Sequence, residues 1–466
     1  MSEAVATQQQ GQAGKYRPYP EYKDSGVEWL GIIPTHWSLH ALKRTVSDCS
    51  NGIWGDEPNG ESDLIVLRVA DFDRNKLTIS DDKLTYRSIS ERERKTRLLK
   101  KGDLLIEKSG GGEKTLVGCV VLFDKEYSAV TSNFVAKMSP REAFCSNFLN
   151  YAFSHLYAGR VNYPSIKQTT GIQNLDSESY LMEHFCFPDS SEQQTIAAFI
   201  DYETARIDRL IAQQQRLIEL LKEKRQAVIS HAVTKGLNPD APMKDSGVEW
   251  LGQVPEHWGV KRLKHISPKI GVGLVINPSH YVQENGVYFL FGGDIEEYGF
   301  KLENTRKMSD ENSRKLPQSR LFENDLVCVR VGYPGITAVV TNDLDGSNCA
   351  SMMVIRRGDF NSNWLAYCLN SDLGKKQVEV VQYGAAQKQY NIADAVEFRF
   401  PVPPIVEQFE ISKYLKEQRD KFNALISKSH STVQLLQERR TALISAAVTG
   451  KIDLRGWTPP AEEVAA

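Results

Sequence analysis

The sequence predicts a mixed α/β fold built as a tandem repeat, in which a long antiparallel two-helix coiled coil separates two α/β domains related by pseudo-two-fold symmetry. Three observations predict this fold. The stretch 23–37 returns at 244–258 with twelve of its fifteen residues identical. A region of short β-branched runs follows each copy, and a block of more than 40 residues without Pro or Gly follows each region. A repeat this long exceeds a solenoid unit of roughly 20–50 residues, so one whole module is used twice.

The repeats divide the 466 residues into six parts. The hydrophobic and charged fractions, 41% and 25%, are typical of a globular protein. No apolar run approaches the roughly 18–20 residues of a membrane span, and the first residues lack the features of a signal peptide, so we expect a cytoplasmic protein. The predicted parts are a disordered tail (1–22), a first α/β domain (23–187), a first long helix (188–237), a second α/β domain (238–400), a second long helix (401–452) and a tail (453–466).

Short apolar runs predict the strands of the first domain. The runs at 64–67, 103–106 and 117–123 are rich in β-branched residues and bounded by Gly, Asp and Lys, which is typical of strands. Apolar residues at helical spacing predict a helix over 147–157.

The second domain repeats this plan with little sequence identity. Loops differ between the copies, whereas residues expected in the scaffold recur, as they would if one fold were adapted to two ligands. The recurring pairs are 102–105 with 324–327, 133–134 with 348–349, 148–151 with 364–367, and 174–175 with 391–392.

Each Pro- and Gly-free block carries a heptad pattern that predicts a coiled-coil helix. A helix this long with a narrow apolar stripe needs a partner, and connectivity makes the two helices antiparallel partners of each other. Pseudo-symmetry then predicts that Glu203 meets Arg439 or Arg440, and that 23–37 lies near the end of the second helix at 446–451. The first helix has a positions at Gln193, Ile200, Ile207, Gln214, Leu221 and Val228, and d positions at Ile196, Glu203, Leu210, Leu217, Lys224 and His231.

Charge and cysteine content limit the classes of partner. The net charge is −2, but the stretches 83–101 and 301–320 are locally basic, one in each repeat, which favours a polyanionic partner. The seven cysteines form no CxxC pair and are odd in number, which argues against a disulfide framework and a structural zinc site.

Motifs for catalysis are incomplete. The glycine-rich stretch 109–115 fails as a phosphate loop because Glu113 separates Gly112 from Lys114. No Asp/Asn-Pro-Pro-aromatic tetrapeptide of an amino-methyltransferase is present. Asp103, Glu107 and Lys108 could suggest a nuclease centre, yet the equivalent 324–325 lacks the following Glu-Lys pair.

The combination of two variable α/β domains, two similar long helices and a Glu-Gln pair entering each helix resembles one family. It is similar to the specificity subunit of type I restriction-modification systems. The repeated stretch Lys-Asp-Ser-Gly-Val-Glu-Trp-Leu-Gly-x-x-Pro-x-His-Trp carries this resemblance, which covers residues 20 to 455.

The resemblance implies a division of labour. Each α/β domain would be a target recognition domain that reads one half of a bipartite site on double-stranded DNA, and the coiled coil would set the spacer. The chain would have no catalytic residues, no metal and no cofactor of its own. Two modification subunits would use S-adenosylmethionine, and two restriction subunits would use ATP and Mg²⁺.

Candidate contact residues come from the variable loops and the repeated stretch. Gln and Arg suit base contacts and Lys suits phosphate. The repeated tryptophans are expected to pack or to dock the modification subunits, because two identical partners need identical surfaces. The expected DNA-binding residues are Lys108, Ser109, Lys114, Arg160, Lys167, Gln168, Thr169, Arg330, Tyr333, Tyr383, Gln387, Lys388 and Gln389, and the expected docking residues are Trp29, Trp37, Trp250 and Trp258.

Two other classes compete with this interpretation. A single-chain bilobal DNA methyltransferase or nuclease would modify or cut DNA without a partner subunit. A structural coiled-coil protein would bind no DNA, but its two domains would then have no reason to differ in their loops.

Overall fold

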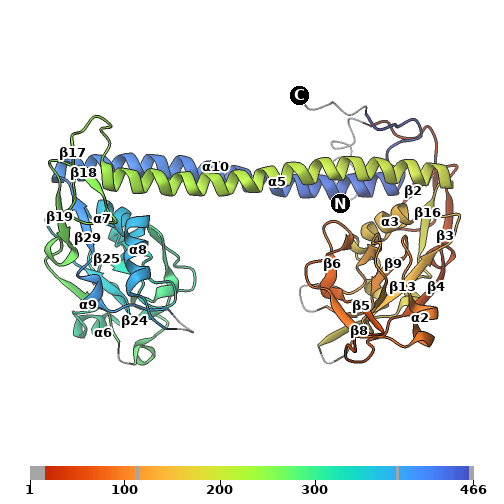
Figure 1. The fold of residues 1–466 in the computed structure, drawn as a ribbon, viewed down its shortest axis with the longest axis horizontal. Helices are drawn as coiled ribbons and strands as arrows, with labels where there is room; N and C mark the ends of the chain where they lie inside the picture. The colour runs from red at the N-terminus through yellow and green to blue at the C-terminus, as the bar shows by residue number, and fades with distance from the viewer. Residues whose placement is uncertain (1–15, 112–114, 170, 276, 385–387, 461–466) are drawn as a thin grey trace. The chain divides into compact units, whose positions relative to one another are not determined.

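The computed structural model describes residues 16–460 except 112–114, 170, 276 and 385–387. It divides into two compact units, unit 1 of residues 1–213 and 432–466 and unit 2 of residues 214–431. Each unit holds one α/β domain together with part of each long helix, α5 (Ser190–Lys235) and α10 (Ile405–Val448) (Figure 1). The mixed α/β class and the paired long helices that the sequence predicts are confirmed.

The domain of unit 1 is built on two small sheets. One has the strand order β11-β9-β13-β4 and the other β12-β5-β8, in which β12 and β5 are parallel. Helix α3 (Ser146–Ala158) packs its buried face, including Phe148 and Phe153, into the same hydrophobic core as the first sheet. The remaining elements are β1 (Tyr22–Asp24), β2 (Ile32–Pro34), β3 (Ser38–Ala41), β4 (Val46–Asn51), β5 (Asp63–Leu67), β6 (Phe72–Asp73), β7 (Thr78–Ile79), β8 (Thr85–Ser88), α2 (Glu91–Arg97), β9 (Leu104–Glu107), β10 (Ser109–Gly110), β11 (Val120–Leu122), β12 (Ala129–Thr131), β13 (Val135–Pro140), β14 (Ile166–Thr169), β15 (Ile172–Leu175), α4 (Ser177–Tyr180) and β16 (His184–Phe187).

The domain of unit 2 repeats this topology. Its sheets have the orders β26-β25-β28-β20 and β27-β21-β24, and β27 is again parallel to β21. Helix α7 (Ser362–Asn370) takes the place of α3. The remaining elements are β17 (Met243–Asp245), β18 (Gln253–Pro255), β19 (Gly259–Arg262), β20 (Ile270–Val272), β21 (Val287–Leu290), β22 (Ile295–Glu296), β23 (Gly299–Phe300), β24 (Lys307–Met308), α6 (Asp310–Lys315), β25 (Leu326–Cys328), β26 (Thr337–Val339), β27 (Asn348–Cys349), β28 (Met353–Ile355), α8 (Asp372–Val381), α9 (Ile392–Ala395) and β29 (Arg399–Val402).

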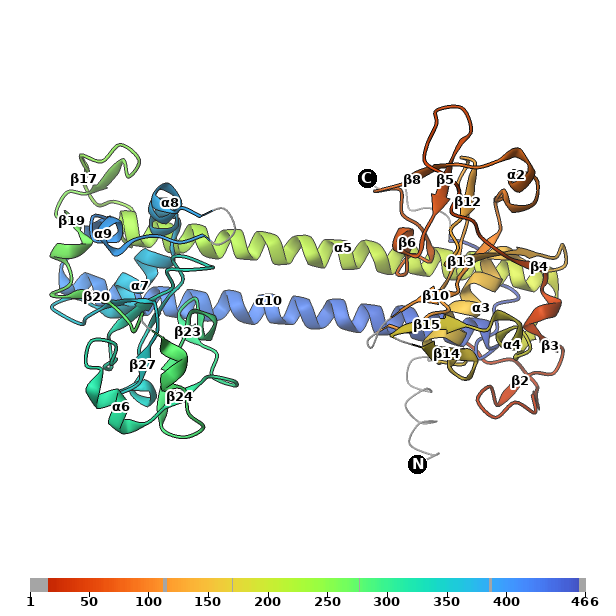
Figure 2. The ribbon, with the colours of Figure 1, turned by 90° about the horizontal axis from the view of Figure 1, so that it is seen from below.

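Within each unit α5 and α10 lie side by side and antiparallel (Figures 1 and 2). Arg440 Nε donates to Asp208 Oδ1 at 3.2 Å in unit 1. In unit 2, Arg225 Nη1 donates to Asn423 Oδ1 at 2.6 Å. Arg225 is the counterpart of Arg440 in the repeat, and Asn423 is the counterpart of Asp208. Equivalent contacts therefore fix the register of the helix pair in each unit. Arg440 therefore pairs with Asp208, about one helical turn from Glu203, and the prediction is wrong for Arg440. The alternative that places Glu203 near Arg439 stays a prediction.

The heptad prediction holds in full only for the first turns of α5, and beyond them the a positions Gln214, Leu221 and Val228 are half-buried. Ile196, Ile200, Glu203 and Ile207 are buried as predicted. Beyond them the predicted d positions Leu210, Leu217, Lys224 and His231 are exposed, and Ile218 is buried instead. An α-helix has 3.6 rather than 3.5 residues per turn, so the buried stripe of a nearly straight helix drifts away from a strict heptad.

The ends of the chain are more ordered than the sequence predicts. Tyr19 is buried in the core of unit 1, and so are Ile452 and Leu454. Asp453 N donates to Arg17 O at 2.7 Å, which ties the two terminal segments together. The predicted tails 1–22 and 453–466 are therefore wrong where the structure describes them, because their aromatic and aliphatic side chains complete the core beside α5.

The repeated stretch lies against the end of a long helix in each unit, as predicted. In unit 1, Tyr22 Oη donates to Gly450 O at 3.0 Å and Lys451 Nζ donates to Ile32 O at 3.0 Å. In unit 2, Gly236 ends α5 beside Trp258. Gly450 and Gly236 both have positive φ, the usual way for glycine to terminate a helix.

Replacing Gly450 with Ala should destabilise unit 1 strongly. The φ of +68° is unfavourable for any side chain, and an added Cβ would lie 2.4 Å from Pro34 Cδ. We expect the free energy of unfolding, measured by urea denaturation, to fall by about 3 kcal/mol. Gly26 has the same φ but open space around its Cβ position, so Gly26→Ala should cost about 1 kcal/mol. Equal losses for the two variants would contradict this account.

Candidate nucleic-acid interface

Unit 1 carries a three-stranded ribbon that gathers residues from three separate segments. Its order is β10-β15-β14. Ser109 lies opposite Asn174, and Asn174 lies opposite Lys167, so these three side chains form one row on the same face. Ser109 Oγ donates to Asn174 Oδ1 at 2.6 Å, and Lys167 Nζ contacts Asp176 Oδ2 at 2.9 Å. We name this row the unit 1 ribbon row: Ser109, Asn174 and Lys167.

Unit 2 carries the same row at equivalent positions. Val331 bridges Gln389, and Gln389 bridges Tyr383. Tyr383 Oη donates to Asn391 Oδ1 at 2.9 Å, the place that Lys167 and Asp176 take in unit 1. We name this row the unit 2 ribbon row: Val331, Gln389 and Tyr383.

Backbone hydrogen bonds show that the two rows are equivalent. Leu175 N donates to Lys108 O at 2.7 Å, and Tyr390 N donates to Arg330 O at 3.3 Å. The pattern of backbone hydrogen bonds is thus the same in both units. The side chains differ, because the unit 1 row carries a hydroxyl, an amide and an ammonium where the unit 2 row carries an isopropyl, an amide and a phenol. One backbone frame presents two different chemical surfaces, which is what reading two different sequences requires.

Most of the sequence-predicted DNA-binding residues fall on or beside these ribbons. Lys108, Ser109, Lys167, Gln168 and Thr169 lie on the unit 1 ribbon or next to it, and Arg330, Tyr383, Lys388 and Gln389 do so in unit 2. Tyr333 is exposed on the turn after Val331. Arg160 is exposed after α3, at φ 56°, and no contact brings it to the ribbon. Lys114 and Gln387 lie outside the described residues.

Sequence reasoning missed the central residue of the first row. It aligned Asn174 with Asn391 as repeated scaffold, but the ladder places Asn174 opposite Ser109 as Gln389 lies opposite Val331. Asn391 instead corresponds to Asp176, since each stands at the N-cap position of a short helix. No sequence pattern signalled this, because the strand exposes Ile172 and buries Gln173, the reverse of what their polarity predicts.

Several of the basic residues in the stretch 83–101 have structural partners. Arg94 Nε donates to Ile89 O at 2.9 Å, and Arg97 Nη1 donates to Gly52 O at 2.9 Å. In the stretch 301–320, Arg306 stacks over Phe291 at 4.4 Å. Some of these basic side chains therefore hold loops in place. Counting the basic residues of a stretch overestimates how many of them are available to contact a polyanion.

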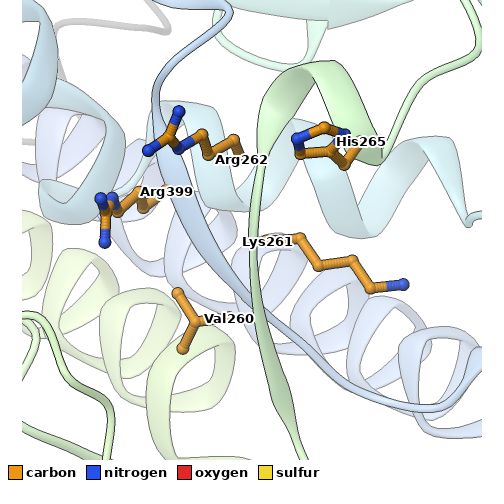
Figure 3. Close-up of a pocket in the computed structure, with 5 residues that line it drawn as sticks. All are labelled: Val260, Lys261, Arg262, His265 and Arg399. Atoms are coloured by element: carbon orange, nitrogen blue, oxygen red, sulfur yellow. The ribbon is translucent and has the colours of Figure 1, made fainter.

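A basic pocket lies on the β19–β29 ladder of unit 2. Figure 3 shows Arg262 and Arg399 on one side of β19 and Lys261 on the other. Arg262 is held by Glu397 at 2.6 Å. In unit 1 the equivalent strands carry His40 and His184. Such a pocket suits a phosphate oxygen. It is lined by Val260, Lys261, Arg262, His265 and Arg399.

The repeated His-Trp pair clamps the first turn of each long helix. Trp37 Nε1 donates to Glu192 Oε1 at 3.1 Å, and His36 Nε2 lies 2.9 Å from Glu192 Oε2. Tyr19 Oη also donates to Glu192, at 2.5 Å, and burial raises the pKa of the Tyr19 phenol well above its usual range, with Glu192 adding to the shift.

Unit 2 repeats the clamp. Trp258 Nε1 donates to Glu407 Oε2 at 3.0 Å, and His257 Nε2 lies 2.8 Å from the same oxygen. These histidines therefore hold structure, in agreement with their place beside a packed Trp.

The expected docking role fits only two of the four tryptophans. Trp37 and Trp258 are fully buried, which is incompatible with a docking surface, so that expectation is wrong for them. Trp29 is 39% exposed and Trp250 is 50% exposed. Trp29 stacks on Phe185 and lies near His155, whose imidazole pKa burial lowers to about 4. The indole of Trp29 therefore packs near a neutral His155 imidazole.

Asp103, Glu107 and Lys108, which could suggest a nuclease centre, each have a structural partner. Glu107 is buried, and Arg74 Nη2 donates to its Oε2 at 2.7 Å. Burial raises the pKa of Glu107, while Arg74 opposes the shift. Lys108 Nζ turns away to Asn51 Oδ1 at 2.7 Å. Across the described part of the chain, no group of three or more His, Cys, Asp or Glu side chains could hold a metal ion, and no helix is long and apolar enough to cross a membrane.

Comparison with known proteins gives a consistent result. No protein-family model matches. The chain is 22% identical over 432 residues to the putative type I restriction enzyme MjaX specificity subunit of Methanocaldococcus jannaschii, covering 91% of this chain and 96% of that protein. It is 25% identical over 256 residues to the EcoBI specificity subunit of Escherichia coli, covering 53% of each.

Two solved structures share the fold. A chain from a study of the assembly and conformational transition of a type I restriction-modification system matches with a TM-score of 0.67 and 16% identity, over 89% of this chain and 98% of that one. The HsdS subunit from Thermoanaerobacter tengcongensis matches with a TM-score of 0.53 and 16% identity, over 92% of this chain and all of that one.

Fold and surface together define a duplicated protein, with one backbone plan and two different sets of exposed side chains. In sequence the chain is similar to specificity subunits of type I restriction enzymes, and in fold it is similar to an HsdS subunit.

Proposed function

We propose that each α/β domain reads one half of a bipartite site on double-stranded DNA and that the long helices set the spacer. The observation that carries this proposal is the pair of ribbon rows, which place different side chains on one repeated ladder. Two readers held on one frame bind bivalently, so a wrong spacing loses the contribution of one half-site.

Within each row the central amide is the strongest candidate for base contact. Asn and Gln suit bidentate pairing with adenine, and Lys167 suits a phosphate. Lys108 and Arg330, which flank the rows, and the basic pocket on β19 and β29 would add contacts to the DNA backbone. We assign no catalytic group, metal or cofactor to this chain, and expect S-adenosylmethionine, ATP and Mg²⁺ to belong to its partners.

The partners proposed are two modification subunits, joined by two restriction subunits. Exposed leucines support two equivalent docking patches. Leu210 and Leu435 are exposed in unit 1, and their equivalents Leu425 and Leu220 are exposed in unit 2. The register set by Asp208 and Arg440 places Leu210 and Leu435 within about one helical turn of each other. Exposed apolar side chains at repeated positions fit two copies of one partner.

Co-expression with the modification subunit tests this function. Methylated adenines mapped across the genome of the host should define one bipartite motif with a constant spacer. The chain purified alone should neither methylate nor cut DNA in the presence of S-adenosylmethionine, ATP and Mg²⁺. Activity of the isolated chain would favour the bilobal methyltransferase or nuclease instead.

Single substitutions in the two ribbon rows test the contribution of each domain separately. Substituting Gln389 with Ala should weaken binding to the cognate site by about 1–3 kcal/mol and relax the motif in one half-site only. Asn174→Ala should do the same in the other half-site. Loss of preference in both halves from one substitution would contradict the assignment of one domain to each half.

A further inference from the structure

The unit 2 ribbon row sets an apolar side chain directly beside an amide. Val331 and Gln389 are bridged, and the backbone hydrogen bonds of this bridge are made by their neighbours, as when Gly332 N donates to Lys388 O at 2.9 Å. The two residues therefore form a non-hydrogen-bonded antiparallel pair, whose Cα atoms lie about 4.5 Å apart and whose side chains are closer than in the other kind of pair. The isopropyl group of Val331 and the amide of Gln389 thus share one face of the ribbon.

Val331 does not serve the core of unit 2. Its side chain is half-buried, and it belongs to none of the hydrophobic clusters that the described residues form. Val329, two residues earlier, is by contrast buried in such a cluster. Tyr333, two residues later, is 80% exposed. The strand therefore leaves the core between 329 and 331, and the isopropyl group of Val331 is free to make an apolar contact with a ligand.

The polar groups of the same row are not equally available. The Tyr383 hydroxyl is used, because it donates to Asn391 Oδ1 at 2.9 Å. The side chain of Gln389, in contrast, forms no hydrogen bond to any residue that the structure describes. A carboxamide offers both an acceptor oxygen and N–H donors, which is the pair of groups that adenine N6 and N7 require. The row thus presents one free amide with one free apolar group next to it.

Unit 1 has a hydroxyl where unit 2 has this isopropyl group. Ser109 is the counterpart of Val331, and its Oγ donates to Asn174 Oδ1 at 2.6 Å. The hydroxyl therefore occupies one side of the Asn174 amide and offers no apolar surface. Because the backbone frame is the same in both units, the difference between the two rows at this position is purely chemical.

We propose that Val331 determines part of the specificity of unit 2 by contacting the C5 methyl group of a thymine. The major-groove edge of an A·T pair presents N7 and the N6 amino group of adenine together with O4 and the C5 methyl group of thymine. Gln389 suits the adenine groups, and the isopropyl group beside it suits a methyl group in the same base pair or the next one. This contact rests on the proposed function, because it names what one domain reads within its half-site.

Replacement of thymine with uracil tests the contact, because uracil keeps O4 and the base pairing and lacks only the methyl group. The complex of the chain with its modification subunits is bound to labelled duplexes that carry the bipartite motif, with each thymine of the motif replaced in turn, and affinity is measured by fluorescence anisotropy. One replacement, in the half-site that Gln389→Ala relaxes, should weaken binding about fourfold, the effect of removing one methyl group from an apolar contact. The Val331→Ala complex should bind the thymine and uracil duplexes equally.

Two further variants control this experiment. Val331→Ile keeps an apolar side chain and should retain the preference for thymine. Ser109→Ala changes the equivalent position of unit 1 and, whatever its effect on overall affinity, should leave the fourfold ratio unchanged. A ratio that survives Val331→Ala, or a motif in which no thymine of that half-site responds, would overturn the Val331 contact alone, since the bipartite site would still be bound. A complex that binds no bipartite site would overturn the contact and the proposed function together.

Discussion

Replacing Glu192 with Ala should cost unit 1 about 3 kcal/mol of its free energy of unfolding. Glu192 accepts from Trp37 and Tyr19 and contacts His36, and its side chain is only 5% exposed. Removing the carboxylate leaves a buried indole N–H and a buried phenol without an acceptor, and each unsatisfied group costs about 1–3 kcal/mol. The loss should be seen as faster amide hydrogen exchange in unit 1, where local opening is measured separately from unit 2.

The repeat supplies the control for this prediction. Glu407→Ala removes the same clamp in unit 2, but Glu407 is 23% exposed and has no tyrosine donor. Water can replace part of what is lost there, so we expect a cost of about 1 kcal/mol. Should both variants lose the same stability, the additional burial under Tyr19 would have no energetic role.

Charged substitutions in the two leucine patches should remove the partner subunits one at a time. Leu210→Asp with Leu435→Asp alters the patch of unit 1, and Leu220→Asp with Leu425→Asp alters that of unit 2. Because these side chains are exposed, the helices should remain folded, whereas an aspartate buried in an interface costs several kcal/mol. Native mass spectrometry should show one modification subunit per chain for either pair and none for the fourfold variant.

Circular dichroism supplies the control for this experiment, because helix content should be unchanged in every variant. Retention of two modification subunits by the fourfold variant would place the docking surface elsewhere, with exposed Trp29 and Trp250 as the remaining repeated candidates.

The repeat made much of the architecture predictable. Identity between 23–37 and 244–258 implied two equivalent modules, and the contacts of Tyr22 and Lys451 confirm the predicted place of the first copy at a helix end. Pro- and Gly-free blocks predicted the long helices, because local propensity and apolar spacing are properties of the chain itself.

The structural roles of individual side chains could not be predicted from the same repeat. Trp37 and Trp29 are both identical in the two copies, yet one is buried on Glu192 and the other is exposed. Identity shows that a residue is constrained, but burial depends on neighbours that are remote in sequence. The predicted d positions of the heptad were also wrong beyond Ile207, since the drift of the buried stripe depends on how the two helices pack.

The sequence by itself determined the duplication, the two long helices, the mixed α/β class and the family resemblance, because each depends on local pattern or on identity between copies. Only the tertiary structure decided which residues meet. It placed Asn174 beside Ser109 and Lys167, buried Tyr19 against Glu192, and left Tyr414 exposed where Phe199 is covered. The physical reason is that these contacts join segments tens to hundreds of residues apart, and their geometry follows from packing rather than from local propensity.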